Sequence, residues 1–308
     1  MRSFPAFALT ACAILSACTQ SQDADFNPNI SVETVRILSS AEFAGREAGT
    51  DGGRRSADKI IRIIEQHSKF KPTRQNFAFM PKGGETPLKG QNLIVTIPGK
   101  NPAGSILVAT AHYDHLGTRG DDIYFGADDN ASGVGGLFAL LQSFEKNAPK
   151  HTVILVFLDA EEQELQGAKA LVENYEPIAD RPLLNLNLDM IAQNQKGELY
   201  MAGSYHTPAL KQLVQNATQG TGIDIKFGHD RPEDGDDDWT SQSDHSVFHK
   251  TGVPFVYFGV EDHKHYHKPT DTFETLPIDF YIKSLHAITN TARALDENLA
   301  KYAKPVSN

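Results

Sequence analysis

The sequence has 308 residues, of which 40% are hydrophobic and 22% charged, and its formal net charge is −10. These proportions are ordinary for a folded globular protein, and the length suits one large domain or two small ones. The acidic balance argues against nucleic acid as a partner, because the phosphates of nucleic acid require a basic surface.

The N-terminal segment has the features of an export signal. Arg2 gives a positive start, and the mostly apolar run from Phe4 to Leu15 is too short for a permanent membrane-spanning helix. The run ends in LSAC, residues 15–18. This motif resembles the lipobox of bacterial lipoprotein signal peptides, which are cut before a cysteine that then receives lipid. The alternative is an ordinary cleaved signal with an incidental cysteine.

The lipoprotein interpretation divides this part of the chain into two pieces. Residues 1–17 are the signal peptide, Cys18 becomes the lipid-anchored N-terminus, and residues 18–30 form a polar tether. Thr19 follows the cysteine where an aspartate would favour the inner membrane, so we expect a bacterial cell-envelope protein on the outer membrane, facing the periplasm. The only other cysteine, Cys12, lies in the removed signal, so no disulfide is expected.

Helix and strand patterns alternate from Ser31 to residue 303, which predicts a single domain. The expected elements are, in chain order, a helix capped by Ser31, a helix over 54–66, strands over 92–97 and 105–111, a helix over 131–145, a strand over 152–158, a helix over 165–175, a strand over 183–188, helices over 207–217 and 243–250, a strand over 253–259 and a helix over 278–300. Segment 72–90, rich in Pro, Gly and Lys, is interpreted as an excursion of the chain within the domain and not as a domain boundary. Strands that are apolar throughout need cover on both faces, so we expect a three-layer α/β/α sandwich.

Imidazoles and carboxylates stand at the points where the predicted strands end. They are His112-Tyr113-Asp114-His115 after 105–111, Asp159-Ala160-Glu161-Glu162 after 152–158, Asp189 after 183–188, the loop with His263, His265 and His267 after 253–259, and Asp128-Asp129-Asn130 before the glycine-rich helix. Functional groups gather beyond the carboxyl ends of strands in open α/β sheets, so we expect these side chains to meet.

The acidic run after the 152–158 strand requires a positive partner, because crowding carboxylates near a core is costly. Its members are Asp159, Glu161, Glu162 and Glu164. Histidine and carboxylate without cysteine suit zinc, with manganese or cobalt as alternatives, so one or two divalent cations are the expected partner. The helical zinc motif H-E-x-x-H and the nucleophile motif G-x-S-x-G are both absent from the sequence.

Five stretches of the sequence carry a family resemblance. They resemble, in the same order, motifs of the co-catalytic zinc aminopeptidases, a clan that includes bacterial leucyl aminopeptidase and glutamate carboxypeptidase: AHYDHLG (111–117), GADDNASG (126–133), DAEEQELQG (159–167), NLDMI (187–191) and HKPTDT (267–272). The resemblance implies a mostly parallel mixed sheet of the zinc-peptidase type, two zinc ions per chain and peptide substrates.

The same resemblance implies a role for each matching residue. The implied metal ligands are His112, Asp129, Glu162, Asp189 and His267. His112 and His267 would bind different metals, and Asp129, joined to Asn130 by a cis peptide, would bridge them. Glu161 would be the general base, and Asp114 would accept a hydrogen bond from His112 and fix its tautomer.

The predicted activity is removal of N-terminal residues from peptides by a metallo-aminopeptidase. The alternatives are a carboxypeptidase of the same fold, a zinc glutaminyl-cyclase-like acyltransferase and a non-catalytic receptor-like homologue. The complete ligand set argues against the last two. A pocket with acids would suit a free ammonium and a pocket with Lys or Arg a free carboxylate, and the sequence leaves this choice, side-chain preference and oligomeric state open.

Two further segments have plain interpretations. Ser243-Asp244-His245 has the letters of a catalytic triad, but residues one or two apart on a helix do not face each other, so Ser243 is interpreted as a helix cap. The acidic run at 233–238 is interpreted as a solvated loop.

Overall fold

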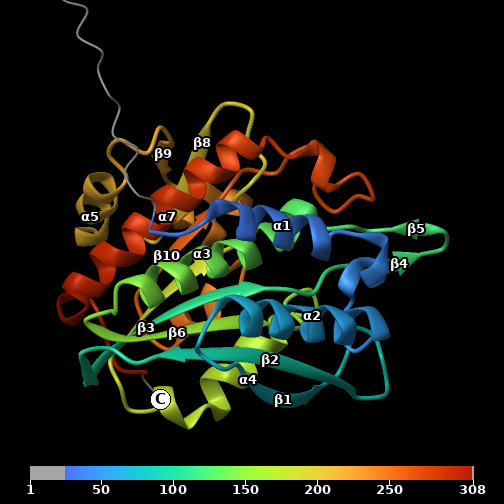
Figure 1. Cartoon of the computed structure of the whole chain (residues 1–308), viewed down its shortest axis with the longest axis horizontal. Coiled ribbons are helices and arrows are strands. Elements are labelled where there is room, and N and C mark those ends of the chain that lie inside the picture. Colours follow the sequence, from blue (N-terminus) through green and yellow to red (C-terminus); the bar gives the residue numbers. More distant parts are fainter. Residues whose placement is uncertain (1–24, 307–308) are drawn as a thin grey trace, which may run out of the picture.

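The structure is a computed structural model that describes residues 25–306, so the predicted signal peptide and Cys18 lie outside the described residues. An eight-stranded mixed sheet, in the order β1-β2-β6-β3-β7-β10-β8-β9, lies between two layers of helices (Figure 1). The expected three-layer α/β/α sandwich, with a mostly parallel mixed sheet in one domain, is confirmed.

The central strands share one direction. β3 pairs in parallel with β6 and β7, and β7 pairs in parallel with β10, so the carboxyl ends of these four strands lie at one edge of the sheet. The strands of the sheet are β1 (Thr73–Phe79), β2 (Leu88–Ile97), β3 (Asn101–His112), β6 (His151–Leu158), β7 (Leu183–Leu188), β8 (Glu198–Ala202), β9 (Asp224–Phe227) and β10 (Phe255–Gly259), and a separate hairpin is formed by β4 (Thr118–Arg119) and β5 (Asp122–Ile123).

Helices cover both faces of the sheet. They are α1 (Pro28–Leu38), α2 (Asp51–His67), α3 (Gly133–Lys146), α4 (Gln166–Asn174), α5 (Ala209–Ala217), α6 (His245–Lys250) and α7 (Ile278–Asn298), with short 3₁₀ turns at Ala41–Arg46, Glu176–Ile178, Pro232–Asp237, Trp239–Ser241, Phe273–Thr275 and Leu299–Lys301 and a π turn at Ala127–Ser132. None of these described helices combines the length and the apolar character that a membrane crossing requires.

β6 shows how the core is divided. All of its residues are buried, and they alternate between two apolar clusters. Val153 and Phe157 join the larger cluster, which includes residues of α1, α2, α3 and α7, whereas Ile154 and Leu158 join the cluster that includes residues of α4 and α6. This alternation is the period of two expected of a strand that is covered on both faces.

β3 follows the same alternation and thereby sets the direction of its last side chain. Leu107 joins the larger cluster and Val108 the α4/α6 cluster. Side chains two residues apart share a face of a strand, so His112, four residues after Val108, lies on the face that α4 and α6 cover. The histidine therefore leaves the carboxyl end of β3 toward these two helices.

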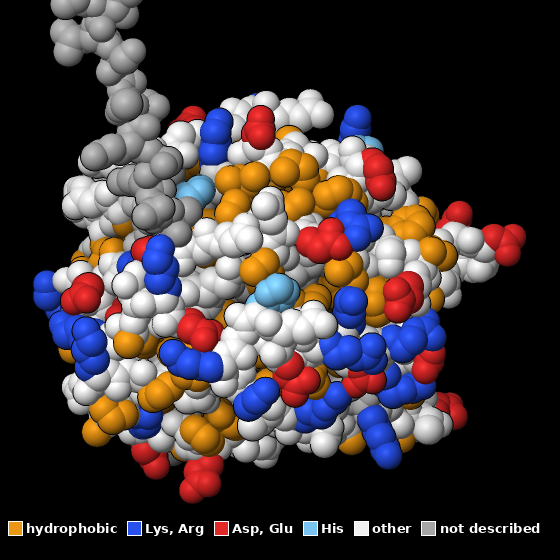
Figure 2. Space-filling model, in the orientation of Figure 1, with side chains coloured by type: hydrophobic (Ala, Val, Ile, Leu, Met, Phe, Trp, Pro, Cys, Tyr) orange, Lys and Arg blue, Asp and Glu red, His pale blue; other side chains and the backbone are white. Residues whose placement is uncertain are grey.

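The surface over α1 and α2 carries charges of both signs (Figure 2). Arg55 of α2 forms an ion pair with Asp51, and Asp58 pairs with Arg74 of β1 at 2.6 Å. This face does not offer the continuous basic surface that nucleic acid requires.

The N-terminal boundary of the domain differs from the expectation. The first helix begins at Pro28, not Ser31, and the side chain of Asn27 accepts a hydrogen bond from the main-chain nitrogen of Asn29. Proline is favoured in the first turn because its fixed φ suits a helix and it needs no hydrogen-bond acceptor there. Phe26 is buried and contacts the ring of His286 on α7, so the end of the predicted 18–30 tether belongs to the domain.

Three strands and the C-terminal boundary also differ from the expectation. The predicted excursion over 72–90 contains β1 and the start of β2, and β8 and β9 were not expected. β1 is an edge strand with mostly exposed or half-buried side chains, and β8 and β9 are short, so none has the apolar run that marks a central strand. Lys304, beyond the predicted end at 303, pairs with Leu183 at the start of β7.

The revised N-terminal boundary can be tested with two truncations. A domain that begins at residue 25 should be as stable as a longer one, whereas a domain that begins at residue 31 should lose at least about 3 kcal/mol of unfolding free energy. The loss follows because Phe26 leaves a cavity and the α1 cap at Asn27 disappears. Urea denaturation of both proteins measures the difference, and equal stabilities would show that residues 25–30 are a tether.

Candidate metal centre

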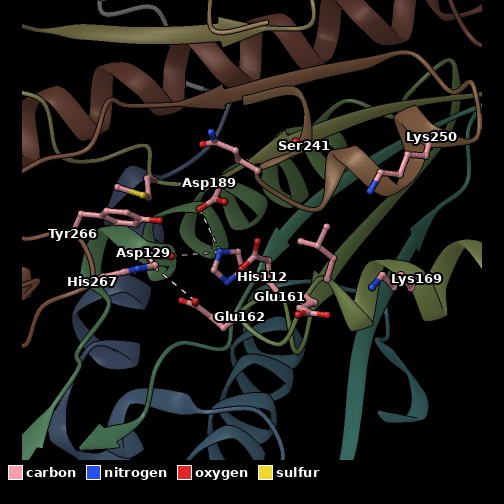
Figure 3. Close-up of a pocket in the computed structure, with 14 residues that line it drawn as sticks. His112, Asp129, Glu161, Glu162, Lys169, Asp189, Ser241, Lys250, Tyr266 and His267 are labelled. Atoms are coloured by element: carbon pink, nitrogen blue, oxygen red, sulfur yellow. Dashed lines mark hydrogen bonds and ion pairs between the residues drawn. The ribbon is translucent and has the colours of Figure 1, made fainter. Parts of the chain in front are cut away.

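The five predicted ligands meet at the carboxyl edge of the sheet, around a cavity of about 430 Å³ (Figure 3). His112 ends β3, Asp189 follows β7 and Glu162 lies in the turn after β6. Asp129 comes from the π turn before α3, and His267 comes from the loop after β10. Four parallel strands and one helix entry therefore deliver these side chains to one place, as the pattern of strand ends predicted.

One group of ligand atoms forms around His112. Its Nε2 atom lies 3.3 Å from Asp189 Oδ1 and 3.4 Å from Asp129 Oδ1. Its Nδ1 atom lies 3.2 Å from the main-chain carbonyl oxygen of Asp114, which only accepts, so Nδ1 carries a proton. Nε2 then faces two carboxylates, and a cation, whether a proton or a metal ion, is needed between them.

A second group forms around the other oxygen of Asp129. Asp129 Oδ2 lies 3.1 Å from His267 Nε2 and 3.6 Å from His115 Nδ1. Glu162 lies on the same side, with Oε1 2.9 Å from His115 Nδ1 and Oε2 3.8 Å from His267 Nε2. The two oxygens of Asp129 thus face two different sets of side chains. The expected cis peptide between Asp129 and Asn130 is present.

His115 is a member of the site to which the sequence assigned no role. It is fully buried, and with Asp129 and Glu162 it forms a group of three possible metal-ligand atoms within 4.8 Å of one another. Burial lowers its pKa to about 3, so the ring is neutral, and its Nε2 atom has no hydrogen-bond partner. Its place in AHYDHLG, three residues after His112, was the available signal.

Asp114 differs in part from its expected role. Its carboxylate lies 3.7 Å from His112 Nδ1, and the closer acceptor is its own main-chain carbonyl, at 3.2 Å. The carboxylate instead accepts hydrogen bonds from the main-chain nitrogens of Glu161, at 3.1 Å, and Glu162, at 3.3 Å. Asp114 therefore holds the turn that carries both glutamates.

A buried arginine that the sequence analysis missed ties the loops together from behind. Arg46 is fully buried and donates hydrogen bonds to the main-chain carbonyls of Leu38, Tyr113, Phe125 and Gly126, at 2.6 to 2.8 Å. These carbonyls flank His112 and the loop of Asp129. Burial lowers the pKa of Arg46 to about 10, while nearby acids, Asp129 first among them, oppose the change.

Asp271 links the loop of His267 to the loop of Asp129. Its carboxylate accepts hydrogen bonds from the main-chain nitrogens of Asp128, at 3.0 Å, and Asp129, at 3.1 Å. Burial raises the pKa of Asp271 to about 7. The backbone of the shared ligand is thus fixed by a residue four positions beyond another ligand.

The electrostatics of the cluster fit a divalent cation. Burial raises the pKa of Glu162 to about 7 and that of Glu161 well above its ordinary value. Burial opposes the charged form of His112, but Asp189 and Glu161 still raise its pKa well above the ordinary value. Buried carboxylates of this kind keep their charge only where a cation offsets it. Imidazole and carboxylate ligands without thiolate suit zinc and similar metals.

Ser243, Asp244 and His245 do not form a catalytic triad, and Ser243 is not the helix cap that was expected. Its Oγ atom accepts a hydrogen bond from Asn187 at 2.9 Å, and the side chain makes no cap bond to α6. His245 Nε2 lies 2.9 Å from the carbonyl oxygen of Trp239. Asp244 is buried with neither carboxylate oxygen bonded, and burial raises its pKa to about 8.

Comparison with known sequences places this site in a family. The pattern that defines the family described as Peptidase family M28 matches residues 92–293, which include all five predicted ligands. The chain belongs to peptidase family M28. The groups of imidazole and carboxylate atoms within the matched region are suited to metal ions.

Curated relatives of this M28 chain include vacuolar membrane proteases of fungi. The protein of Lachancea thermotolerans is 26% identical over 167 residues, which are 54% of this chain and 16% of the relative. That of Schizosaccharomyces pombe is 24% identical over 233 residues, which are 72% of this chain and 26% of the relative. The chain therefore spans a small part of the length of these relatives.

Solved structures show that the fold is shared with zinc aminopeptidases and with a cyclase. The zinc aminopeptidase BSAP of Bacillus subtilis superposes with a TM-score of 0.72, at 16% identity, over 92% of this chain and 97% of that one. Glutaminyl cyclase of Porphyromonas gingivalis gives a TM-score of 0.70, at 19% identity, over 89% of this chain and 99% of that one. At these identities the likeness concerns the fold alone.

Arg46 provides a test of how the site is held. Arg46→Met should lower the unfolding free energy by at least about 3 kcal/mol and reduce zinc binding, because four buried carbonyls lose their donor and the acids lose a cation. Arg54→Met, which removes an exposed arginine paired with Asp51, should change stability by less than about 1 kcal/mol. Denaturation and zinc titration of both variants measure this, and equal effects would refute the role of Arg46.

Proposed function

We propose that the chain is a metallo-aminopeptidase that binds two zinc ions and removes N-terminal residues from peptides. His112 and Asp189 would hold one ion, Glu162 and His267 the other, and Asp129 would be shared. The observation that supports this most is Asp129, whose Oδ1 atom lies 3.4 Å from His112 Nε2 and whose Oδ2 atom lies 3.1 Å from His267 Nε2. Manganese or cobalt would suit the same atoms.

When bound, the metal ions supply a Lewis acid that lowers the pKa of water and polarises the peptide carbonyl. Glu161 lines the cavity beside the ligands and is the residue proposed to take the proton of the attacking water and return it to the leaving amine. The hydrogen bonds from Glu161 and Glu162 to Asp114 fix the backbone of both glutamates, which supports separate roles for these neighbours.

The competing activities differ in what they require of this site. A glutaminyl cyclase has the same fold, as the Porphyromonas gingivalis enzyme illustrates, so the fold does not decide between the two. Four of the five predicted ligands lie around the two oxygens of the fifth, Asp129, which favours a hydrolase with two metal ions over a site with fewer ligands. The same observation argues against a receptor-like homologue that has lost its chemistry.

Two isosteric variants test the proposed mechanism. Glu161→Gln should lower kcat by at least ~10²-fold, because an amide cannot take the proton, while zinc content and Tm stay near those of the parent. Glu162→Gln should instead weaken zinc binding, because a charged ligand is lost. The measurements are kcat, bound zinc and Tm, with peptides whose N-terminus is free or acetylated and with or without a chelator.

The outcomes of this experiment separate the alternatives. Hydrolysis that requires both a free N-terminus and metal would support an aminopeptidase, and equal hydrolysis of acetylated peptides would contradict it. If Glu161→Gln lost zinc while Glu162→Gln kept it, the two roles would be reversed. A parental rate in Glu161→Gln would refute the mechanism.

We also propose that the protein is a lipoprotein of the bacterial cell envelope, anchored through Cys18 to the outer membrane and facing the periplasm. The support is the LSAC motif at residues 15–18 with Thr19 behind it. A peptidase held there would act on peptides in the periplasm.

The anchor is tested by Cys18→Ser. This variant should not be lipidated or processed, and it should remain in the aqueous phase of a detergent partition, while the parent enters the detergent phase. Peptidase activity of the purified domain should be unchanged, because the cavity lining that the structure describes runs from His112 to His267, far along the chain from residue 18. Mass spectrometry that finds an unmodified N-terminus in the parent would defeat the proposal.

A further inference from the structure

We propose that the catalytic cavity recognises a carboxylate of its peptide substrate through Lys169 and Lys250. The substrates would then be short peptides, with the carboxylate supplied by a free C-terminus or by an acidic side chain next to the scissile bond. This inference rests on the proposed peptidase function of the same cavity and names the class of peptide that it takes. Lysines that meet a free C-terminus also fit the carboxypeptidase alternative, which the free and acetylated peptides described above distinguish from an aminopeptidase.

The two lysines come from neighbouring helices on one side of the cavity. Lys169 lies in α4 and Lys250 is the last residue of α6, and these helices pack against each other on the face toward which His112 leaves β3. Both lysines line the cavity together with Glu161 and His112. Figure 3 shows both amines turned toward the cavity, across it from Asp129, His267 and Tyr266.

Neither lysine has a partner that would explain its position. Among residues 25–306, the side-chain amines of Lys169 and Lys250 form no ion pair and no hydrogen bond, whereas the amine of Lys226 on β9 pairs with Asp224 at 2.9 Å. A lysine at the end of α6 is favoured by the helix dipole, but Lys169 lies within α4, where that explanation does not hold. Two unpaired ammonium groups over one cavity thus call for a ligand with negative charge.

The charges of the cavity have opposite signs at its two ends. Figure 3 shows Asp129, Glu162 and Asp189 on one side of the cavity and the two lysines on the other. Glu164, which also lines the cavity, is exposed and forms no ion pair with either lysine. In the zinc-loaded site the ions would offset the charges of Asp129 and Asp189, so the two lysines remain as the positive side chains of the lining that attract a substrate carboxylate. A peptide whose scissile carbonyl lies at the metal ligands would therefore direct its carboxylate toward α4 and α6.

The size of the cavity favours short peptides. Its volume of about 430 Å³ lies toward the lower end of the range for small-ligand sites, about 300–1,000 Å³. One residue of extended chain spans at most about 3.6 Å, so a dipeptide or tripeptide brings its C-terminus within a few ångströms of the residue that is cleaved. In such a peptide the α-carboxylate is the charge that the lysines would meet first.

The test measures binding without turnover, in the zinc-loaded Glu161→Gln protein. Three probes are titrated by calorimetry: Ala-Ala with a free C-terminus, its C-terminal amide, and the amide of Ala-Glu. Lys169→Met, Lys250→Met and the pair are added to this background, because methionine keeps the apolar stem and removes the charge. Lys71→Met is the matched control, since Lys71 is exposed and does not line the cavity.

We expect the free acid to bind at least about tenfold more tightly than its amide, as for a charge-assisted hydrogen bond. Each lysine variant should reduce this preference, the pair should abolish it, and Lys71→Met should keep it. A gain for the Ala-Glu amide over the Ala-Ala amide would assign the site to an acidic side chain as well, and no gain would restrict it to the C-terminus.

Equal binding of acid and amide, or a preference that survives the pair of substitutions, would overturn the inference. The parent's hydrolysis rates, measured in parallel, keep this failure distinct from failure of the proposed function. Hydrolysis of acid and amide at equal kcat/KM would leave a peptidase without carboxylate recognition. If the protein hydrolysed neither the acid nor the amide but still bound the acid more tightly through the lysines, the carboxylate site would be supported and the peptidase mechanism refuted.

Discussion

The crowding of carboxylates at one edge of the sheet is the constraint on which the rest of the site depends. Asp129, Glu162 and Asp189 place oxygen atoms around three imidazoles in a buried region, and burial drives the pKa of Glu162 up to about 7. Such a cluster keeps its charge only if cations offset it. Arg46 supplies positive charge from behind, and metal ions would supply it at the front, so folding and metal binding are expected to be coupled.

The backbone around the cluster is held by groups that bind no metal in the proposed site. Arg46 bonds to carbonyls of the His112 and Asp129 loops, Asp271 accepts from the amide of Asp129, and Asp114 accepts from the amides of both glutamates. Three of the non-glycine residues with positive φ lie in these loops: Ala160 precedes Glu161, Met190 follows Asp189, and His267 is itself a proposed ligand. Non-glycine residues rarely adopt this conformation, so the surrounding hydrogen bonds are what maintain it.

The sequence predicted the elements and residues that local patterns determine. It did not predict the contacts that form between loops far apart in the chain. Apolar strands such as 152–158 and the polar residues at their ends were readable, because burial on both faces leaves an uninterrupted run. β1 was missed because most side chains of this edge strand are exposed or half-buried, so its sequence has no apolar run. The start of α1 was placed too late, although Asn27-Pro28 is itself a helix-start signal. Arg46 could not be assigned, because its role follows from carbonyls that lie far away in the sequence. His115 had a signal in its motif, but its role depends on Glu162, which lies in the turn after another strand.

In the proposed site, chemistry and substrate recognition occupy different elements of the fold. The metal ligands follow strands and a tightly bonded turn, where a change of one residue would move several hydrogen bonds at once. Lys169 and Lys250 project from α4 and α6, whose buried faces pack on the sheet through other residues such as Leu171 and Phe248. The charge that these helices present to the cavity can therefore vary without disturbing the ligand geometry. The preference for acidic, neutral or basic peptides would then depend on the surfaces of α4 and α6. The residues at the strand ends would carry out the same reaction in each case.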